Sequence, residues 1–235
     1  MLAAEKQKIM DFLDLTDDFL GSGYKSGRNT ENFKEDAPET IEKISEEIRI
    51  CKNCQLGNLR KNAVPGEGSL NPLVMVIGEG PGMDEDDQGR PFVGKAGHLL
   101  DKMLASIGLS RNSNAFIANV VKCRPPGNRD PYPEEASACS GFLERQILLL
   151  KPKFILAAGR ISAQTLLKTA EPIGKLRGSF TDFKAGGLTF PLFVIYHPAA
   201  VLRNDSLRRP VWEDLKILRS RMEEQYGGEL KIEGV

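Results

Sequence analysis

Four cysteines are the residues whose type and spacing point most directly to chemistry. Cys51 and Cys54 form a C-x2-C pair; 68 residues separate this pair from Cys123, and 15 more separate Cys123 from Cys139. Thiolates at these positions suit a tetrahedral zinc ion or a cubane iron–sulfur cluster, and the spacing leaves both open. Two disulfides fit less well, because a cytoplasmic chain of this size neither needs nor readily keeps them. The sequence therefore predicts one metal site that ties the amino-terminal part of the chain to a loop at residue 123.

Other candidate residues follow short apolar runs. The glycine-rich stretch 78–97, GEGPGMDEDDQGRPFVGKAG, has too many glycines to start a helix before residue 95, and it lacks the Gly-Lys-Ser or Gly-Lys-Thr of a P-loop. Because glycine lets a backbone approach a flat or charged ligand, a nucleotide-cradling loop is the first interpretation. Asn119 is the single polar side chain in AFIANVV, and a buried amide there needs a partner. His197 ends another run and is one of only two histidines in the chain.

The composition is that of a folded chain with room for one sizeable core. The 235 residues are 40% hydrophobic and 27% charged, and no apolar run is long enough to span a bilayer. No secretory signal is expected either, so we predict a cytoplasmic protein without membrane contact. The 32 basic and 32 acidic residues balance, but residues 88–129 hold seven bases against one acid. This basic zone is compatible with a nucleic-acid partner or with a solvated surface.

The elements that must position these residues are predicted to alternate. Four apolar runs, starting at residues 72, 115, 154 and 190, are expected to be strands, with helices at about 96–107, 134–150 and 161–167 and after residue 212. This order predicts a three-layer α/β/α sandwich with a four-stranded parallel central sheet. Ligands of such sheets bind beyond the carboxyl ends of the strands, where the glycine-rich stretch, Asn119 and His197 would meet. A helical extension with a linker over 1–45, a domain over 46–222 and a tail over 223–235 complete the prediction.

The motifs together resemble a known family. The glycine-rich stretch 78–97, NVVKCRPPGNRDP, Cys139 and HPAAVLRN occur in the order found in family 4 uracil-DNA glycosylases, the iron–sulfur enzymes of bacteria and archaea. The similarity runs from about residue 46 to about residue 219. It implies a uracil-DNA glycosylase-like fold and one 4Fe-4S cluster on Cys51, Cys54, Cys123 and Cys139. It also implies a monomer that acts on uracil in single- or double-stranded DNA, releasing free uracil and leaving an abasic site.

The resemblance gives roles to the residues of the expected pocket. Phe92 is the candidate that stacks on a flipped base, although a phenylalanine seen alone is more often part of a core. The amide of Asn119 complements O4 and N3–H of uracil and mismatches the amino group of cytosine. His197 would donate to O2, and Gly80 would bring the backbone to the base. Related glycosylases of another family have an aspartate at the position of Gly80.

That missing carboxylate leaves two glutamates as catalytic candidates. The resemblance suggests Glu85 as a substitute that assists the water, with Glu79 ordering the loop or contacting the base. We expect a dissociative reaction in which His197 and the DNA phosphates supply most of the electrostatic stabilisation.

Further residues are expected to contact DNA. Val201 or Leu202 could fill the space left by the flipped base, and the phosphate-contact candidates are Lys122, Arg124, Arg129 and Arg203. Two alternatives stay open at this point. One is a glycosylase for other deaminated bases such as hypoxanthine, and the other is a non-catalytic iron–sulfur protein that binds nucleic acid or transfers electrons.

Overall fold

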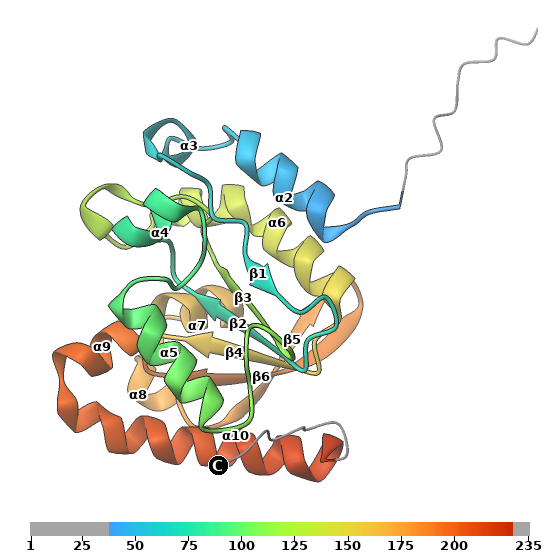
Figure 1. Ribbon diagram of the computed structural model, residues 1–235, viewed down its shortest axis with the longest axis vertical. Coiled ribbons are helices and arrows are strands. Elements are labelled where there is room, and N and C mark those ends of the chain that lie inside the picture. Colours follow the sequence, from blue (N-terminus) through green and yellow to red (C-terminus); the bar gives the residue numbers. More distant parts are fainter. Residues whose placement is uncertain (1–37, 228–235) are drawn as a thin grey trace, which may run out of the picture. The chain divides into compact units, whose positions relative to one another are not determined.

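The computed structural model describes residues 38–227 (Figure 1). The helix and linker expected in the first 30 residues lie outside the described residues. A compact unit starts at Glu39. The expected boundary between residues 45 and 46 falls inside helix α2 (Ile41–Ile50), and the one between 222 and 223 falls inside α10 (Arg208–Tyr226). Both helices run continuously across these positions.

The centre of the molecule is one mixed sheet in the strand order β1-β3-β2-β4-β6-β5. The four predicted strands form its parallel middle: β2 (Val74–Gly78), β3 (Ala115–Asn119), β4 (Phe154–Ala158) and β6 (Leu188–Ile195). The predicted count of four was wrong, because β1 (Glu67–Gly68) and β5 (Phe180–Ala185) add antiparallel edges. The two-residue β1 is too short to leave a pattern, and β5 carries polar side chains because only one of its edges is paired.

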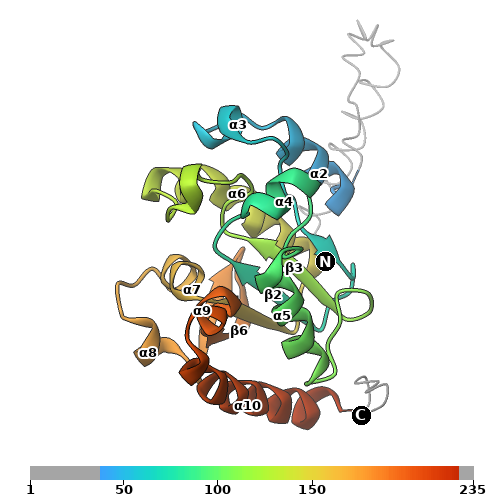
Figure 2. The same ribbon diagram turned by 60° about the vertical axis from the view of Figure 1, so that its left-hand side comes forward.

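Helices cover both faces of this sheet, which confirms the predicted three-layer class (Figure 2). Side chains from α2, α6 (Pro133–Leu150) and α7 (Arg160–Leu167) pack on one face. Side chains from α5 (Lys95–Ala105), α9 (Pro198–Arg203) and α10 pack on the other. The central strands β2, β3 and β4 are buried along their whole length, as expected for parallel strands covered on both sides.

Short helices complete the fold, and one of them corrects an expectation. The glycine-rich stretch contains α4 (Met83–Gln88) well before residue 95, because its glycines stand at the ends of the helix and not within it. Gly82 is the N-cap, and Gly89 ends the helix with a φ of 69°, a left-handed conformation that favours glycine. The remaining short helices are α3 (Leu56–Leu59) and α8 (Ile173–Leu176), with 3-10 turns at Pro126–Asn128 and Asp205–Leu207.

Helix α2 carries the chain to the first cysteine. Its amino-terminal cap is Thr40, whose side chain accepts a hydrogen bond from the backbone N–H of Lys43 at 3.2 Å. Ile44 and Ile48 are fully buried in the core that α2 shares with α6. At the surface of this contact, Arg145 forms ion pairs with Glu39 and Glu47. Within residues 38–227, no helix has the length and apolar character needed to cross a membrane.

The packing of α2 yields a stability prediction. We expect Ile48→Ala to lower the free energy of unfolding by about 2–5 kcal/mol, because it leaves a cavity one turn before Cys51. The partly exposed Arg145 serves as the control, and Arg145→Gln should cost no more than about 1 kcal/mol. Urea unfolding of both variants measures the difference. Equal losses would show that ion pairs, not apolar packing, hold α2 in place.

Candidate functional site

A cavity of about 670 Å³ lies at the carboxyl ends of the parallel strands. It brings together residues that are far apart in the sequence and that the sequence analysis had singled out. The predicted residues that line it are Glu79, Gly80, Glu85, Phe92, Asn119, Arg129, His197 and Arg203. The carboxyl ends of the strands therefore do converge on one site, as the topology requires.

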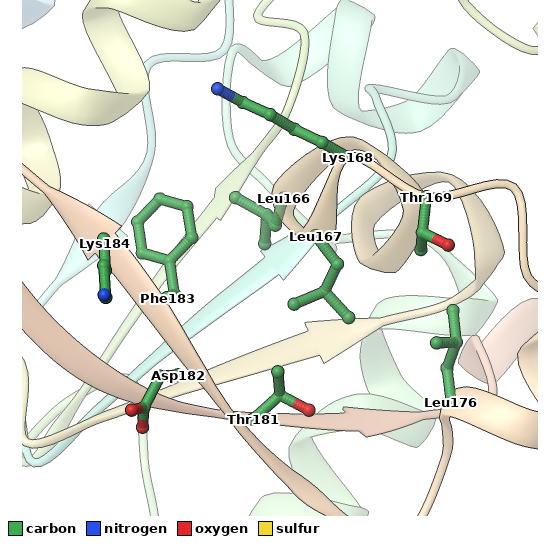
Figure 3. Close-up of a pocket in the computed structure, with 9 residues that line it drawn as sticks. All are labelled: Leu166, Leu167, Lys168, Thr169, Leu176, Thr181, Asp182, Phe183 and Lys184. Carbon is green, nitrogen blue, oxygen red and sulfur yellow. The ribbon is translucent and has the colours of Figure 1, made fainter.

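A second cavity, of about 480 Å³, lies between α7, α8 and strand β5 (Figure 3). Leu166, Leu167 and Phe183 contribute much of its lining, and its titratable side chains are Lys168, Asp182 and Lys184. No residue that the sequence analysis assigned to a site lines it. The chemistry of the described residues therefore points to the cavity at the strand ends.

Asn119 is the most informative residue of that cavity. It ends β3, its exposed fraction is 2%, and its Oδ1 is a buried acceptor without a hydrogen-bond partner among the described residues. Gly78 lies directly opposite on β2, and a Cβ atom there would overlap Asn119 Oδ1 and the ring of Phe92. Leaving a buried polar atom unpaired costs about 1–3 kcal/mol. The site therefore presents an acceptor that a donor group on a bound molecule would satisfy.

Phe92 is held in an unusual conformation beside Asn119. Its ring is buried, and its φ of 52° lies in the left-handed region that non-glycine residues rarely adopt. Arg111 fixes the backbone by donating to the carbonyl oxygen of Phe92 at 2.8 Å. The ring centroid lies 5.6 Å from that of His197 at an interplanar angle of 31°. Strain of this kind persists where the surroundings enforce it, and here the strained residue is one that lines the cavity.

His197 is placed as a neutral hydrogen-bond donor. It caps α9, and its Nδ1 accepts a hydrogen bond from the backbone N–H of Ala199 at 3.1 Å. The ring proton of the neutral imidazole must then reside on Nε2. Burial, together with the positive charge of Arg203, lowers the pKa of His197 to about 4. The imidazole is therefore uncharged at neutral pH, with Nε2–H as its only ring donor.

Glu85 is bound to the backbone, and its expected role in assisting the water stays a prediction. One of its carboxylate oxygens accepts from the N–H of Gly82 at 3.0 Å, and the other accepts from Val93 at 3.0 Å and Gly94 at 3.1 Å. A carboxylate with both oxygens engaged in this way closes the glycine-rich loop around Phe92. Glu85 is therefore a positioning residue for the loop.

Glu79 has the properties that the sequence analysis sought in Glu85. It follows β2, is half-buried, and lines the cavity. Burial and the neighbouring negative charge of Asp130 raise the pKa of Glu79 to about 7, while Arg160 and Arg203 act in the opposite direction. A carboxyl group with such a pKa can accept a proton near neutral pH. Asp130 and Arg160 were missed by the sequence analysis, although Arg160 stands almost directly after β4, where a charged residue is a signal.

The expected DNA contacts divide into two groups. Arg129 and Arg203 line the cavity, and Arg124 and Leu202 are at least partly exposed. Lys122 and Val201 do not fit, because their exposed fractions are 1% and 2%. Val201 belongs to the core between α5, α9 and α10. The ammonium group of Lys122 donates to Gln146 Oε1 at 2.7 Å inside the protein, so neither residue can reach DNA in this conformation.

The four cysteines line one small cavity next to the loop that follows β3. Arg60 joins their segments: its guanidinium donates to Cys123 Sγ at 2.8 Å and to the carbonyl oxygens of Arg49 at 2.6 Å and Cys51 at 3.0 Å. The backbone N–H of Lys122 donates to Cys139 Sγ at 3.4 Å. Among residues 38–227, no three Cys, His, Asp or Glu side chains are grouped as ligands of a single metal ion. Four thiols around one cavity, with donors aimed at sulfur, fit a group that is larger than one ion.

Comparisons with known proteins match the range that contains the cavity. The family model of the uracil DNA glycosylase superfamily matches residues 65–216. The Type-4 uracil-DNA glycosylase of Pyrobaculum aerophilum is 47% identical over 179 residues, which cover 74% of this chain and 91% of the relative. The corresponding enzyme of Thermotoga maritima is 43% identical over 185 residues, covering 77% and 94%. A Type-5 uracil-DNA glycosylase of Pyrobaculum aerophilum is 31% identical over 153 residues, covering 58% and 65%.

The unpaired acceptor of Asn119 yields a prediction about stability. We expect Asn119→Ala to leave the free energy of unfolding unchanged or to raise it by up to about 2 kcal/mol, because an unsatisfied buried oxygen is removed. Gln146→Ala is the matched control, because this buried amide is satisfied by Lys122 and by the carbonyl oxygen of Pro65. It should destabilise the protein by about 1–3 kcal/mol. Calorimetry or urea unfolding compares the two, and an equal loss in both variants would contradict the interpretation of Asn119.

Proposed function

This chain belongs to the uracil DNA glycosylase superfamily, and from that premise we propose how its cavity works. The protein is a DNA repair enzyme that hydrolyses the N-glycosidic bond of deoxyuridine in DNA, releasing uracil and leaving an abasic site. A base inside a duplex cannot be reached, so the nucleotide must swing out into the cavity. The observation that carries the assignment of the cavity to uracil is the buried, unpaired oxygen of Asn119.

Asn119 supplies the recognition of uracil. Its Oδ1 accepts from N3–H, and its amide NH₂ donates to O4. Cytosine presents an unprotonated N3 and an amino group at these positions, so it would leave the amide of Asn119 facing two mismatched groups. Phe92 stacks on the ring, and the backbone at Gly80 approaches it. A side chain at position 80 would interfere with this approach, because even a Cβ atom there would crowd Val121.

His197 and Glu79 act on the bond that breaks. As the bond between C1′ and N1 breaks, its electron pair moves to the uracil ring, and His197 Nε2–H stabilises the negative charge on O2. A water oxygen bonds to C1′, and Glu79 accepts a proton of that water. A neutral imidazole can donate its Nε2–H without first taking up a proton from solvent. This agrees with the pKa of His197 of about 4, which keeps the imidazole neutral at pH 7.

The four cysteines are proposed to hold one 4Fe-4S cluster. The shared cavity and the hydrogen bonds to sulfur from Arg60 and Lys122 support it. When bound, the cluster would supply covalent links between the segment that follows α2, the loop after β3 and helix α6, a structural contribution. Burial raises the pKa of the Cys123 thiol to about 11, so ligation would have to displace a tightly held proton.

Arg124, Arg129 and Arg203 are proposed to contact phosphates, and Leu202 is proposed to fill the space left by the flipped base. Leu202 is 45% exposed and lies on α9 between Val201 and Arg203, near the cavity that receives the base. We further propose that the enzyme acts as a monomer on single- and double-stranded DNA. The cytoplasmic location stays a prediction.

The direct test of this function uses oligonucleotides that carry one uracil, one hypoxanthine or one thymine. Alkaline cleavage after incubation detects abasic sites, and released bases are identified by chromatography. We expect release of uracil and a loss of about 10²- to 10³-fold in rate for His197→Leu, because a donor to the developing anion is removed. The rate of uracil release by Asn119→Ala should fall at least as far as that of His197→Leu. Base release from hypoxanthine alone, or DNA binding without release of any base, would overturn the proposal.

The pKa of Glu79 predicts the dependence of the rate on pH. As the pH falls below about 7, Glu79 takes up a proton and can no longer accept one, so kcat/KM should fall about tenfold per pH unit. His197 does not titrate in this range. Measuring kcat/KM from pH 5 to pH 9 gives the profile. The Glu79→Gln variant should have a low kcat/KM, and its profile should lack the acid limb, that is, the fall in kcat/KM below about pH 7. A wild-type profile that is flat between pH 5 and pH 8 would exclude this role.

A structural cluster predicts a particular defect in Cys139→Ser. This variant should lower iron content, soluble yield and the free energy of unfolding, because the link between α6 and the other cysteines is lost. The rate of uracil release per folded, iron-loaded molecule should change much less. Iron analysis, urea unfolding and turnover on the same preparation separate these effects. A stable, iron-loaded variant without activity would show that the cluster takes part in the chemistry.

A further inference from the structure

Three charged side chains from different elements line the cavity. Glu79 follows β2, Asp130 lies in the segment before α6, and Arg160 is the first residue of α7. Arg160 Nη2 contacts Asp130 Oδ2 at 2.5 Å, and the other side of its guanidinium donates to Gln164 Oε1 at 3.3 Å. Glu79 and Asp130 lie close enough for their carboxyl groups to interact, and this interaction raises the pKa of Glu79. None of these contacts involves a residue that recognises the base.

The pairing of two carboxyl groups has a chemical consequence. An ionised carboxylate only accepts hydrogen bonds, so a hydrogen bond between two carboxyl groups requires that one of them carries a proton. The guanidinium of Arg160 lies on Asp130 and favours the ionised form of that partner. When this pair takes up a proton, Glu79 is therefore the group that binds it, and Glu79 is also the more buried of the two.

We propose that Asp130 and Arg160 are positioning residues that set the protonation of Glu79 through their charges, with the ion pair of Arg160 keeping Asp130 ionised. This inference rests on the proposed role of Glu79 as the group that accepts the proton of water. It assigns functions to two residues that do not touch the base. The two act with opposite sign, because Asp130 favours the protonated form of Glu79 and Arg160 favours the ionised form.

The electrostatics of the cavity agree with this arrangement. Burial is the largest cause of the raised pKa of Glu79, Asp130 adds to it, and Arg160 and Arg203 oppose it. The other charged or titratable side chains that line the cavity are Asp84, Glu85, Lys95, Arg129, Tyr196 and His197. Among them, Glu85 is engaged with backbone N–H groups and His197 is neutral. Substitutions of Asp130 and Arg160 should therefore shift the pKa of Glu79 without changing the residues that contact the base.

The test is the position of the acid limb in the pH profile of kcat/KM, which reports the free enzyme. Asp130→Asn keeps a hydrogen-bonding side chain but removes the negative charge, so the acid limb should move to lower pH. Arg160→Gln removes the positive charge, so the limb should move to higher pH. Because the Asp130 side chain is 56% exposed in its ion pair, solvent screens the effect. We expect shifts of about half a pH unit or more in each direction.

Matched controls and a second readout separate the possible outcomes. Asp182→Asn and Arg208→Gln remove charges that lie outside the cavity lining and should leave the limb in place. Titration of the Glu79 carboxyl carbon by NMR in each variant should show the same opposite shifts without relying on turnover. Suppose that the wild-type enzyme shows the acid limb, but that the limb moves in the same direction in Asp130→Asn and Arg160→Gln, or does not move in either. That result would overturn this inference. A wild-type limb that persists in Glu79→Gln would instead overturn the proposed role of Glu79.

Discussion

The pairing of Gly78 with Asn119 across the β2–β3 ladder is the constraint on which the cavity depends. Because Gly78 has no side chain, Asn119 Oδ1 and the ring of Phe92 both come close to its Cα, where a Cβ would overlap them. The register of a parallel sheet fixes this pairing. The strained backbone of Phe92, the loop closed by Glu85 and the unpaired amide oxygen therefore form one arrangement.

The loop after β3 connects this arrangement to the cysteine site. Asn119 lines the base cavity, and Cys123, four residues later, lines the cysteine cavity. Arg60 ties Cys123 to the carbonyl oxygens at the end of α2, and the buried ammonium of Lys122 is held between the two sites by Gln146. A cluster on the cysteines would thus stiffen the loop that directly follows Asn119. A structural group at one site would in this way support recognition at the other.

The sequence predicted the parts of the fold that follow from long apolar patterns. Apolar patterns predicted the four central strands and the helices α5, α6 and α7. The convergence of Asn119, Phe92 and His197 was predictable as well, because the carboxyl ends of parallel strands meet at one edge of the sheet. The short edge strands and α4 were not, since they depend on pairing and capping and leave little periodicity. The contacts of Glu85 with three backbone N–H groups were not predicted, because such hydrogen bonds cannot be read from residue types. The burial of Lys122 and Val201 was not predicted either, because a basic or an apolar residue in a motif can point toward the core or toward solvent.

A crystal structure of the protein with free uracil would show directly whether the cavity receives the base. We predict that uracil lies against Phe92, with N3–H on Asn119 Oδ1 and O2 on His197 Nε2, while the protein backbone around Gly78 stays in place. Uracil bound elsewhere, or bound in this cavity with Asn119 Oδ1 still unpaired, would contradict it.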